Sequence, residues 1–424
     1  MDRIVMHIDV NNAFLSWTAI YLLEHGYDKD IRNICAVIGG DESSRHGIVL
    51  AKSTPAKKYG IVTAETLYQA RKKCPNLEVY PSNYQYYQKK SEELFSLISS
   101  YTPDIEKFSI DECFLEYTYV KNLYGDPVEF AYKLKDEIKN KLGFTVNIGI
   151  ANNKLCAKMA SDFEKPDKVH TLFMDEVQTK MWPLDVGDLL WIGKKTKLKL
   201  NQLGIRKIGD LAISDQKDLY YYFKNQTKTM IEHANGIDDD PVKVVRGEAK
   251  GMSKTVTLDH DVNSRIELYD NLNLIANDLG LALRSKEKYA NTIAIILKDQ
   301  YFKSKTHQMK LPNSTNSTNI IYDTSKKLLD ETWEGESIRL IGIRLDGLTA
   351  TGLYQYSLFE DTKVYENDTK LDSVMDSLKN KYGTKIINKA SILSKTKKVW
   401  YNLTKNRREE YGKNKKRSKK WRNC

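Results

Sequence analysis

The stretch Lys107-Phe-Ser-Ile-Asp-Glu-Cys-Phe-Leu-Glu-Tyr117 decides how the chain is interpreted. Apolar and polar residues alternate on both sides of Ser109-Ile110-Asp111-Glu112, which predicts two short strands joined by a tight turn. Acidic residues are common in turns for conformational reasons alone. A chemical role for Asp111 and Glu112 therefore depends on which other groups lie near them.

A third carboxylate, Asp9, lies near the end of an apolar run from Ile4 to Val10. That run predicts a buried strand, and a helix with an asparagine near its cap is expected to follow. Asp9 by itself fits a helix-capping role. Together with Asp111 and Glu112 it fits a phosphoryl-transfer site, in which two Mg²⁺ ions roughly 3.5–4 Å apart are held by carboxylates and substrate phosphates. Spacing alone leaves both interpretations open.

Predicted strands alternate with predicted helices over residues 1–165, which indicates an α/β or α+β unit. Within this unit Gly47–Lys52 and Gly60–Glu65 are expected to be short strands. From about residue 166 to 235 the pattern is helical. Lys243–Gly251 has the irregular composition of a linker.

Residues 252–358 return to an alternation of strands and helices. The polar run Asn313–Asn319 predicts a surface loop within that region. A further helix is expected over Leu371–Tyr382.

The chain has 424 residues and a formal charge of +11, and that charge is concentrated at one end. The last 30 residues contain 13 basic and two acidic residues, so the preceding 394 residues hold 54 of each sign. A basic tail on a neutral body favours a polyanionic partner, but it also fits a tail that only solubilises.

Composition excludes several classes of protein. A hydrophobic content of 41% supports real cores, and the length suggests about two to four domains. No apolar run approaches the roughly 18 residues needed to span a bilayer, and the N-terminus lacks a signal-peptide layout. The five cysteines are scattered, which favours a reducing cytoplasm over a disulfide framework or zinc site.

Four motifs occur together: Asp9-Val10-Asn11-Asn12-Ala13-Phe14, Pro55-Ala56-Lys57-Lys58-Tyr59-Gly60, Ser109-Ile110-Asp111-Glu112 and Lys165-Pro166. Their order and spacing resemble those of the bacterial Y-family, DinB/UmuC-type, DNA polymerases. The resemblance covers roughly residues 3–385, and Ser-Ile-Asp-Glu is highly specific in this setting.

The resemblance implies an α+β multidomain fold of the right-hand polymerase type, with a palm, small fingers, a helical thumb containing a helix-hairpin-helix, and a C-terminal α/β little finger. It divides the chain into a palm at 1–10 and 81–165, fingers at 11–80, a thumb at 166–240, a linker at 241–251, a little finger at 252–358, and an extension with the basic tail at 359–424.

The resemblance also assigns the metal site. It implies that the catalytic residues Asp9, Asp111 and Glu112 hold two Mg²⁺ ions and that the Val10 carbonyl is a further ligand. This agrees with the interpretation of the three carboxylates from their chemistry.

For the nucleotide, the resemblance makes Phe14 an aromatic steric gate under the sugar and Lys165 a contact to the terminal phosphates. As a bare feature, Phe14 equally fits an ordinary core residue. Lys57 stands where the family usually has an arginine, and Thr54 where it usually has a tyrosine. Lysine keeps the charge but loses the bidentate fork, so nucleotide affinity is in question at these positions.

A basic stretch from Trp191 to Ile208 contains six basic residues and no acid. It fits a solvated helix face, but the glycine before the predicted helix also offers main-chain N–H groups to a phosphate. The string Gly193-Lys194-Lys195-Thr196 resembles part of the helix-hairpin-helix of the family's thumb. Ser253-Lys254-Thr255-Val256-Thr257 resembles the edge of the family's little finger, which lies along the duplex, and this implies that Lys254 binds DNA.

The peptide Gln355-Tyr356-Ser357-Leu358-Phe359 follows the last predicted domain. It fits an ordinary strand end. It also resembles the motif that docks bacterial sliding clamps, in which Gln355 is a polar anchor and Leu358 and Phe359 enter an apolar pocket.

The resemblance implies a template-directed, low-fidelity DNA polymerase that performs translesion synthesis in DNA repair and the SOS response. Its expected partners are primer-template DNA, deoxynucleoside triphosphates and the sliding clamp, and it is expected to be a cytoplasmic monomer that does not bind membranes. Two alternatives remain open. One is a catalytically weak DNA- and clamp-binding scaffold of the same fold, and the other is a two-metal nuclease.

Overall fold

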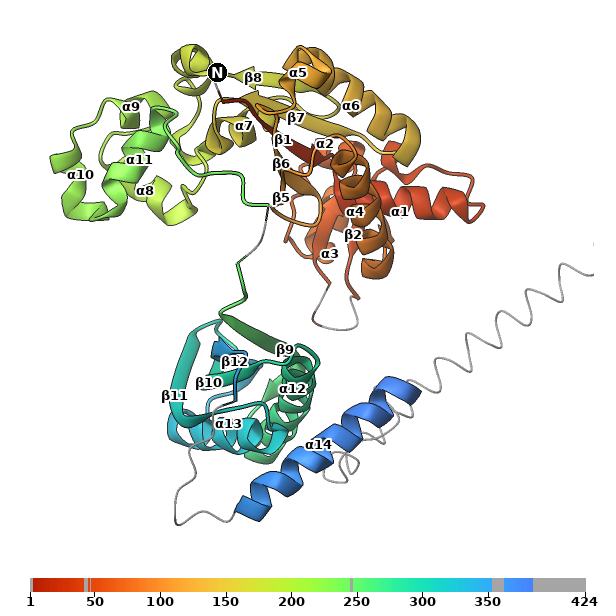
Figure 1. Ribbon diagram of the computed structural model, residues 1–424, viewed down its shortest axis with the longest axis vertical. Coiled ribbons are helices and arrows are strands. Elements are labelled where there is room, and N and C mark those ends of the chain that lie inside the picture. The colour runs from red at the N-terminus through yellow and green to blue at the C-terminus, as the bar shows by residue number, and fades with distance from the viewer. Residues whose placement is uncertain (1–2, 42–44, 46, 245–246, 353–361, 384–424) are drawn as a thin grey trace, which may run out of the picture. The chain divides into compact units, whose positions relative to one another are not determined.

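The computed structural model describes residues 3–41, 45, 47–244, 247–352 and 362–383, with side chains in the last range from residue 370. The chain forms two compact units, Met1–Gly247 and Glu248–Cys424, and each is described by itself (Figure 1). The basic tail and the predicted clamp-binding residues Gln355, Leu358 and Phe359 lie outside the described residues. In the described part of the chain, no helix is both long and apolar enough to cross a membrane.

The centre of the first unit is a five-stranded sheet in the order β5-β6-β1-β7-β8. Strand β1 is the apolar run that the sequence predicts to be buried, and it pairs antiparallel with β6 and β7. The expected hairpin around Ser109–Glu112 is formed by β5 and β6. The strands are β1 Val5–Val10, β5 Ile105–Lys107, β6 Glu112–Glu116, β7 Val146–Ala151 and β8 Val169–Leu172.

Side chains of β1 alternate between two cores, as strand geometry requires. Met6 and Ile8 pack on one face with residues of α4 (Tyr84–Ser99) and α6 (Pro127–Leu142). Val5 packs on the other face with residues of α7 (Lys154–Ser161). His7 and Asp9 follow Val5 with a period of two, so both belong to the α7 face.

The close packing of α7 on β7 depends on Gly149. A Cβ atom at this position would lie 2.0 Å from the Ala157 carbonyl oxygen and 2.5 Å from the Ser161 nitrogen. Only glycine allows a helix to lie this near the sheet. Residues on the facing side of α7 therefore reach across to β1.

A smaller sheet in the order β3-β2-β4 lies between β1 and α4 in the sequence. The helices and strands of this part of the chain are α1 Ala13–Glu24, η1 Ile31–Asn33, β2 Ala36–Gly39, β3 Val49–Lys52, α2 Thr54–Lys58, α3 Leu67–Lys73 and β4 Glu78–Tyr80. The prediction of a strand over Gly60–Glu65 is wrong. Gly60 adopts a left-handed conformation (φ 72°), and the Glu65 side chain accepts a hydrogen bond from the Val62 N–H, which closes a turn.

The prediction of helical structure from residue 166 onward is wrong at its start, because β8 pairs in parallel with β7. Beyond β8 the chain is helical, and its apolar residues share a core with α7. The remaining helices of this unit are α5 Lys121–Tyr124, η2 Met174–Glu176, η3 Val177–Met181, η4 Val186–Asp188, α8 Lys194–Gln202, α9 Ile208–Ala212, α10 Gln216–Phe223 and α11 Gln226–Ala234.

The second unit is a sheet in the order β11-β10-β12-β9 with α12 and α13 packed on one face. The elements are β9 Gly251–Val262, α12 Arg265–Ser285, β10 Tyr289–Asp299, β11 Ser304–Thr315, α13 Thr318–Thr332, β12 Ile338–Thr349 and α14 Thr362–Tyr382. The prediction of a loop over Asn313–Asn319 is wrong. The edge strand β11 runs to Thr315, and Ser317 already caps α13 by accepting a hydrogen bond from the Ile320 N–H.

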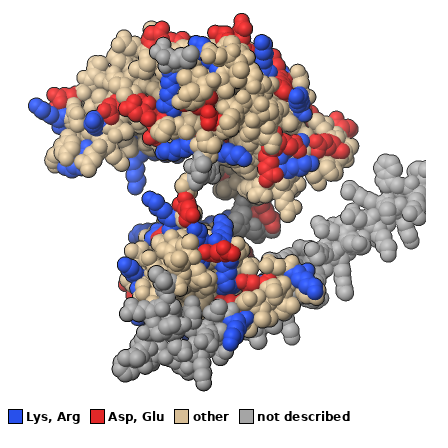
Figure 2. Space-filling view, viewed as in Figure 1, with Lys and Arg blue, Asp and Glu red and all other residues tan. Residues whose placement is uncertain are grey.

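Basic and acidic side chains are mixed on the surface. On the face seen in Figure 2, Lys and Arg are interspersed with Asp and Glu on both units. The 394 residues that precede the basic tail carry equal numbers of basic and acidic residues. Any electrostatic attraction to DNA in the described residues must therefore be local.

Candidate active site

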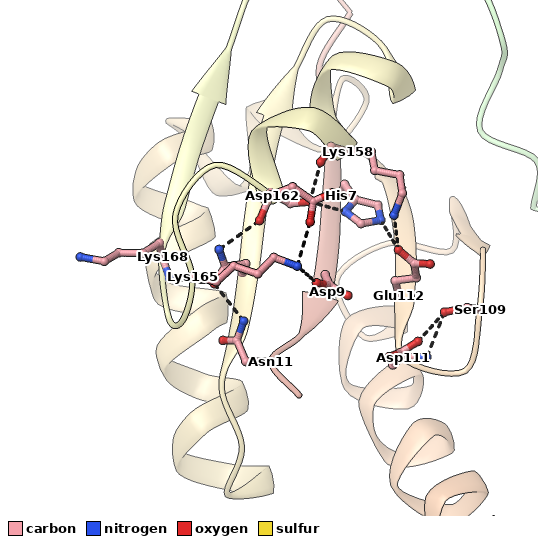
Figure 3. A network of polar contacts seen from close by, with 12 residues as sticks. His7, Asp9, Asn11, Ser109, Asp111, Glu112, Lys158, Asp162, Lys165 and Lys168 are labelled. Carbon is pink, nitrogen blue, oxygen red and sulfur yellow. Dashed lines mark hydrogen bonds and ion pairs between the residues drawn. The ribbon is translucent and has the colours of Figure 1, made fainter. Parts of the chain in front are cut away.

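Strand register brings two of the three predicted catalytic carboxylates side by side. Asp9 of β1 lies directly opposite Glu112 of β6. Asp111 precedes Glu112, and its main-chain carbonyl accepts a hydrogen bond from the Val10 N–H (3.0 Å). Asp9 and Glu112 therefore share one end of the sheet, with Asp111 at the adjoining turn (Figure 3).

The two adjacent acids have opposite electrostatic environments. Burial raises the pKa of Asp111 against a hydrogen bond from Ser109 Oγ (2.5 Å), and the charges of Asp9 and Glu112 add to the rise. Burial also raises the pKa of Glu112, but hydrogen bonds from His7 and Lys158 outweigh burial and lower that pKa to about 2. Glu112 is therefore the more firmly ionised of the two.

His7 orients Glu112 from the neighbouring strand. Burial lowers the pKa of His7, against the hydrogen bond to Glu112, which raises it. Because a carboxylate only accepts hydrogen bonds, the imidazole Nε2–H donates to Glu112 Oε2 (3.1 Å). The imidazole Nδ1 lies 2.8 Å from the Ser161 hydroxyl on α7, and that hydroxyl donates to the Lys158 carbonyl oxygen (2.8 Å).

Two lysine side chains supply positive charge to the carboxylates. Lys158 Nζ lies 2.5 Å from Glu112 Oε2. Lys165 Nζ donates to Asp9 and lies 2.9 Å from Asp162 Oδ1. Burial alone lowers the pKa of Lys165, but the charge of Asp9 and the hydrogen bonds to Asp9 and Asp162 raise it overall. The lysine is therefore held as a cation beside a predicted metal ligand.

Among the residues that the structure describes, no three His, Cys, Asp or Glu side chains converge closely enough to hold a metal ion. The chemistry of the predicted ligands nevertheless fits Mg²⁺, which prefers carboxylate and carbonyl oxygens. The charges of Asp9 and Glu112 help to raise the pKa of Asp111. Both carboxylates therefore lie near enough to Asp111 to interact with it electrostatically. The three acids thus fit a divalent cation, and lysine ammonium groups pair with two of them in this structure.

Phe14 lies in the first turn of α1, and its ring is fixed by aromatic neighbours. The ring stacks on Tyr87, with centroids 4.7 Å apart and planes within 8°. Trp17 and Tyr84 contact it from other sides, at centroid distances of 6.2 and 5.8 Å. Phe14 remains only half-buried, so part of the ring is open to a ligand.

A cavity of 340 Å³ opens where α1 and α2 begin. Its lining includes Thr54, Asn11, Asn12 and Pro166. The structure therefore brings Thr54 and the neighbour of Lys165 to one cavity. Lys57 is exposed on the last turn of α2.

The predicted DNA-binding glycine begins a helix. Gly193 is the N-cap of α8 and supplies no side-chain cap, and the first main-chain N–H groups of a helix have no partner within that helix. Lys194 and Lys195 are exposed, and Thr196 is half-buried. In the second unit, Lys254 lies on β9 and forms an ion pair with Asp278 of α12 (2.5 Å).

The sequence interpretation omitted His7, Lys158 and Ser161. Their contacts join residues 46 to 154 positions apart, which no local pattern reveals. One signal was available: His7 precedes Asp9 by two positions in a strand, and these residues must share a face.

Residues 8–162 match the model of the impB/mucB/samB family, and residues 249–358 match that of its C-terminal domain. DNA polymerase IV of Clostridium acetobutylicum is 46% identical over 399 residues, which span 94% of this chain and 100% of that protein. DNA polymerase IV 1 of Bacillus subtilis is 32% identical over 416 residues, which span 95% of this chain and 97% of that protein. A chimeric Y-family DNA polymerase of known structure matches with a TM-score of 0.71 at 22% identity and covers 82% of this chain and 100% of its own.

The fold is that of a right-hand polymerase with palm, fingers, thumb and little finger. The chain belongs to the impB/mucB/samB family and is a bacterial DinB-type DNA polymerase of the Y-family. The predicted family, fold class and enzyme class are confirmed. As a DNA polymerase it acts on primer-template DNA and deoxynucleoside triphosphates.

Proposed function

We propose that this polymerase carries out low-fidelity translesion synthesis by two-metal-ion nucleotidyl transfer, in the cytoplasm, within DNA repair and the SOS response. The observation that carries the proposal is the register of β1 and β6, which sets Asp9 opposite Glu112 with Asp111 at the next turn. Carboxylates so placed can hold Mg²⁺ together with substrate phosphates.

The metal ligands are Asp9, Asp111, Glu112 and the Val10 carbonyl. Two Mg²⁺ ions held there would supply positive charge that lowers the pKa of the primer 3′-hydroxyl and neutralises the departing pyrophosphate. The chain holds the carboxylates at fixed positions and keeps Glu112 ionised through His7 and Lys158. Such positioning and charge supply most of the acceleration in phosphoryl transfer.

The incoming nucleotide lies against Phe14 and the cavity beside it. A ring held by Tyr87 leaves no room for a 2′-hydroxyl, so deoxyribose is selected by exclusion. Lys165 contacts the terminal phosphates, with Thr54 and Lys57 as further phosphate contacts. Neither Thr54 nor Lys57 offers the bidentate fork of an arginine, so we expect modest nucleotide affinity.

DNA is held by local contacts to its backbone. The main-chain N–H groups at Gly193 to Thr196 seat a phosphate, and Lys194 and Lys195 add charge. Lys254 adds less than its position suggests, because Asp278 already neutralises it.

The domain boundaries are those implied by the resemblance, with the palm continued through β8 because that strand pairs with β7. The enzyme works as a monomer and docks the sliding clamp through Gln355, Leu358 and Phe359. Replacing Leu358 and Phe359 with alanine should abolish stimulation by the clamp and leave distributive synthesis intact. Undiminished stimulation of this variant would contradict the docking assignment.

Primer extension with Mg²⁺ tests the catalytic proposal. The unaltered enzyme should extend a primer and continue past a defined abasic site, whereas Glu112→Gln should reduce the rate of incorporation about 1,000-fold without weakening DNA binding. Glu92→Gln, an exposed acid on α4, is the matched control. DNA binding without extension by the unaltered enzyme would favour the scaffold, and extension that stops at the lesion would contradict translesion synthesis.

A further inference from the structure

The segment that carries Lys165 has no regular secondary structure, although the position of its ammonium group matters. Residues 162–168 connect α7 to β8 without helix or strand. Lys165 is in the middle of this segment and reaches Asp9. Contacts from outside the segment must fix its conformation, because ordering a stretch that has no helix or strand costs conformational entropy.

Asn147 supplies fixed points on both sides of Lys165. This residue of β7 is fully buried and lies directly opposite Asp9 in the sheet. Its Nδ2 donates to the carbonyl oxygens of Ser161 (3.0 Å) and Glu164 (2.7 Å). Its Oδ1 accepts from the Lys168 N–H (3.2 Å). One side chain therefore grips the segment before and after the lysine.

Asn11, the residue directly after β1, holds the same segment from the other side. Its Nδ2 donates to Asn147 Oδ1 (3.0 Å), and its own Oδ1 accepts from the Asp167 N–H (2.9 Å). Asn11 is 5% exposed, so these bonds are shielded from water. With Asn11 in place, Asn147 makes four hydrogen bonds, which is the full capacity of an amide.

We infer that Asn147, locked by Asn11, is a positioning residue that sets Lys165 for the triphosphate of the incoming nucleotide. The inference rests on the proposed function, in which Lys165 contacts those phosphates. It explains why an amide is needed: the site requires two donors toward carbonyl oxygens and an acceptor for two N–H groups. A carboxylate at Asn147 would accept but not donate, and it would set negative charge against the carbonyl oxygens of Ser161 and Glu164.

The test compares Asn147→Asp with the unaltered enzyme in nucleotide binding and in steady-state synthesis. On a primer ended by a dideoxynucleotide, which prevents chemistry, the Kd of the correct nucleotide should rise about tenfold. In synthesis KM should rise in parallel while kcat changes less than about twofold, because a ground-state contact is lost. The Kd for primer-template DNA should stay the same.

The decisive measurement is a double-mutant cycle with Lys165→Ala. If Asn147 acts through Lys165, Asn147→Asp should not weaken nucleotide binding further in the Lys165→Ala background. An equal weakening in both backgrounds would overturn the inference. So would a Kd for Asn147→Asp equal to that of the unaltered enzyme.

Two further variants separate positioning from general damage. Asn152→Asp changes another palm asparagine that donates to a carbonyl, that of Arg3 (3.1 Å), and it should leave the nucleotide Kd unchanged. Asn11→Ala removes the donor toward Asn147 and the acceptor for the Asp167 N–H without adding charge beside the nucleotide, so it should also raise the nucleotide Kd, and it serves if Asn147→Asp does not fold. Failure of the proposed function would differ, because the unaltered enzyme would then add no nucleotide.

Discussion

The lysines of the palm and those of the thumb occupy opposite physical environments. Lys158 is half-buried, and both Lys158 and Lys165 pair at short range with carboxylates of the sheet, whereas Lys194 and Lys195 are exposed where α8 begins. In the palm the positions are set by strand register and close packing, so a small displacement removes the function. On the thumb, charge acts through solvent and is screened by salt. The same residue type therefore works by geometry in one region and by its field in the other.

This contrast predicts that the largest loss follows from changing a residue whose function depends on its precise position. Phe14→Ala removes a ring that stacks on Tyr87 and opens the space beneath the sugar. Discrimination against ribonucleotides, measured as the ratio of kcat/KM values, should fall on the order of 100-fold. Incorporation of deoxynucleotides should change much less. Unaltered sugar discrimination would contradict the gate assignment and would mean that Phe14 serves only the core.

On the thumb, a smaller and salt-dependent effect is expected. Replacing Lys194 and Lys195 together with glutamine should weaken binding of primer-template DNA by about three- to tenfold at moderate salt and reduce the slope of log K against log salt by about 2. Titrations at several salt concentrations measure both. Replacing Lys121, which begins α5, is the control and should leave the slope unchanged. A loss of affinity that does not depend on salt would mean that these lysines act through precisely placed contacts rather than through their charge.

The same contrast explains what the sequence could and could not predict. β1 and the hairpin were predictable because apolar runs and alternation are local patterns. Strand β8 was not, since it is only four residues long and includes His170 and Thr171. Strand β11 was missed because an edge strand is largely exposed and carries polar residues, with Pro312 tolerated there.

In the site, the carboxylates were predicted because the motifs around them resemble those of the Y-family polymerases, whereas their spacing alone left capping and turn roles open. Their supports were not. His7, Lys158 and Asn147 act across strands or between a helix and the sheet, and such contacts depend on register and packing that a single sequence does not specify. The motif residues are therefore visible in the sequence, whereas the residues that position them are visible only in the fold.

A further expected effect concerns the dependence of stability on pH. The pKa of Glu112 is held at about 2, below its usual value of 4.5, so its ionised form stabilises the fold above about pH 4.5 and that contribution is lost as pH falls toward 2. Glu112→Gln should therefore unfold more easily than the unaltered protein at neutral pH, by at most about 3 kcal/mol, and the difference should shrink in acid. Denaturant unfolding at pH 7 and at pH values below 4.5, with Glu92→Gln as control, measures the difference. If the difference in free energy of unfolding stays constant with pH, His7 and Lys158 stabilise Glu112 through packing rather than through its charge. That result would contradict the electrostatic role given to these two residues.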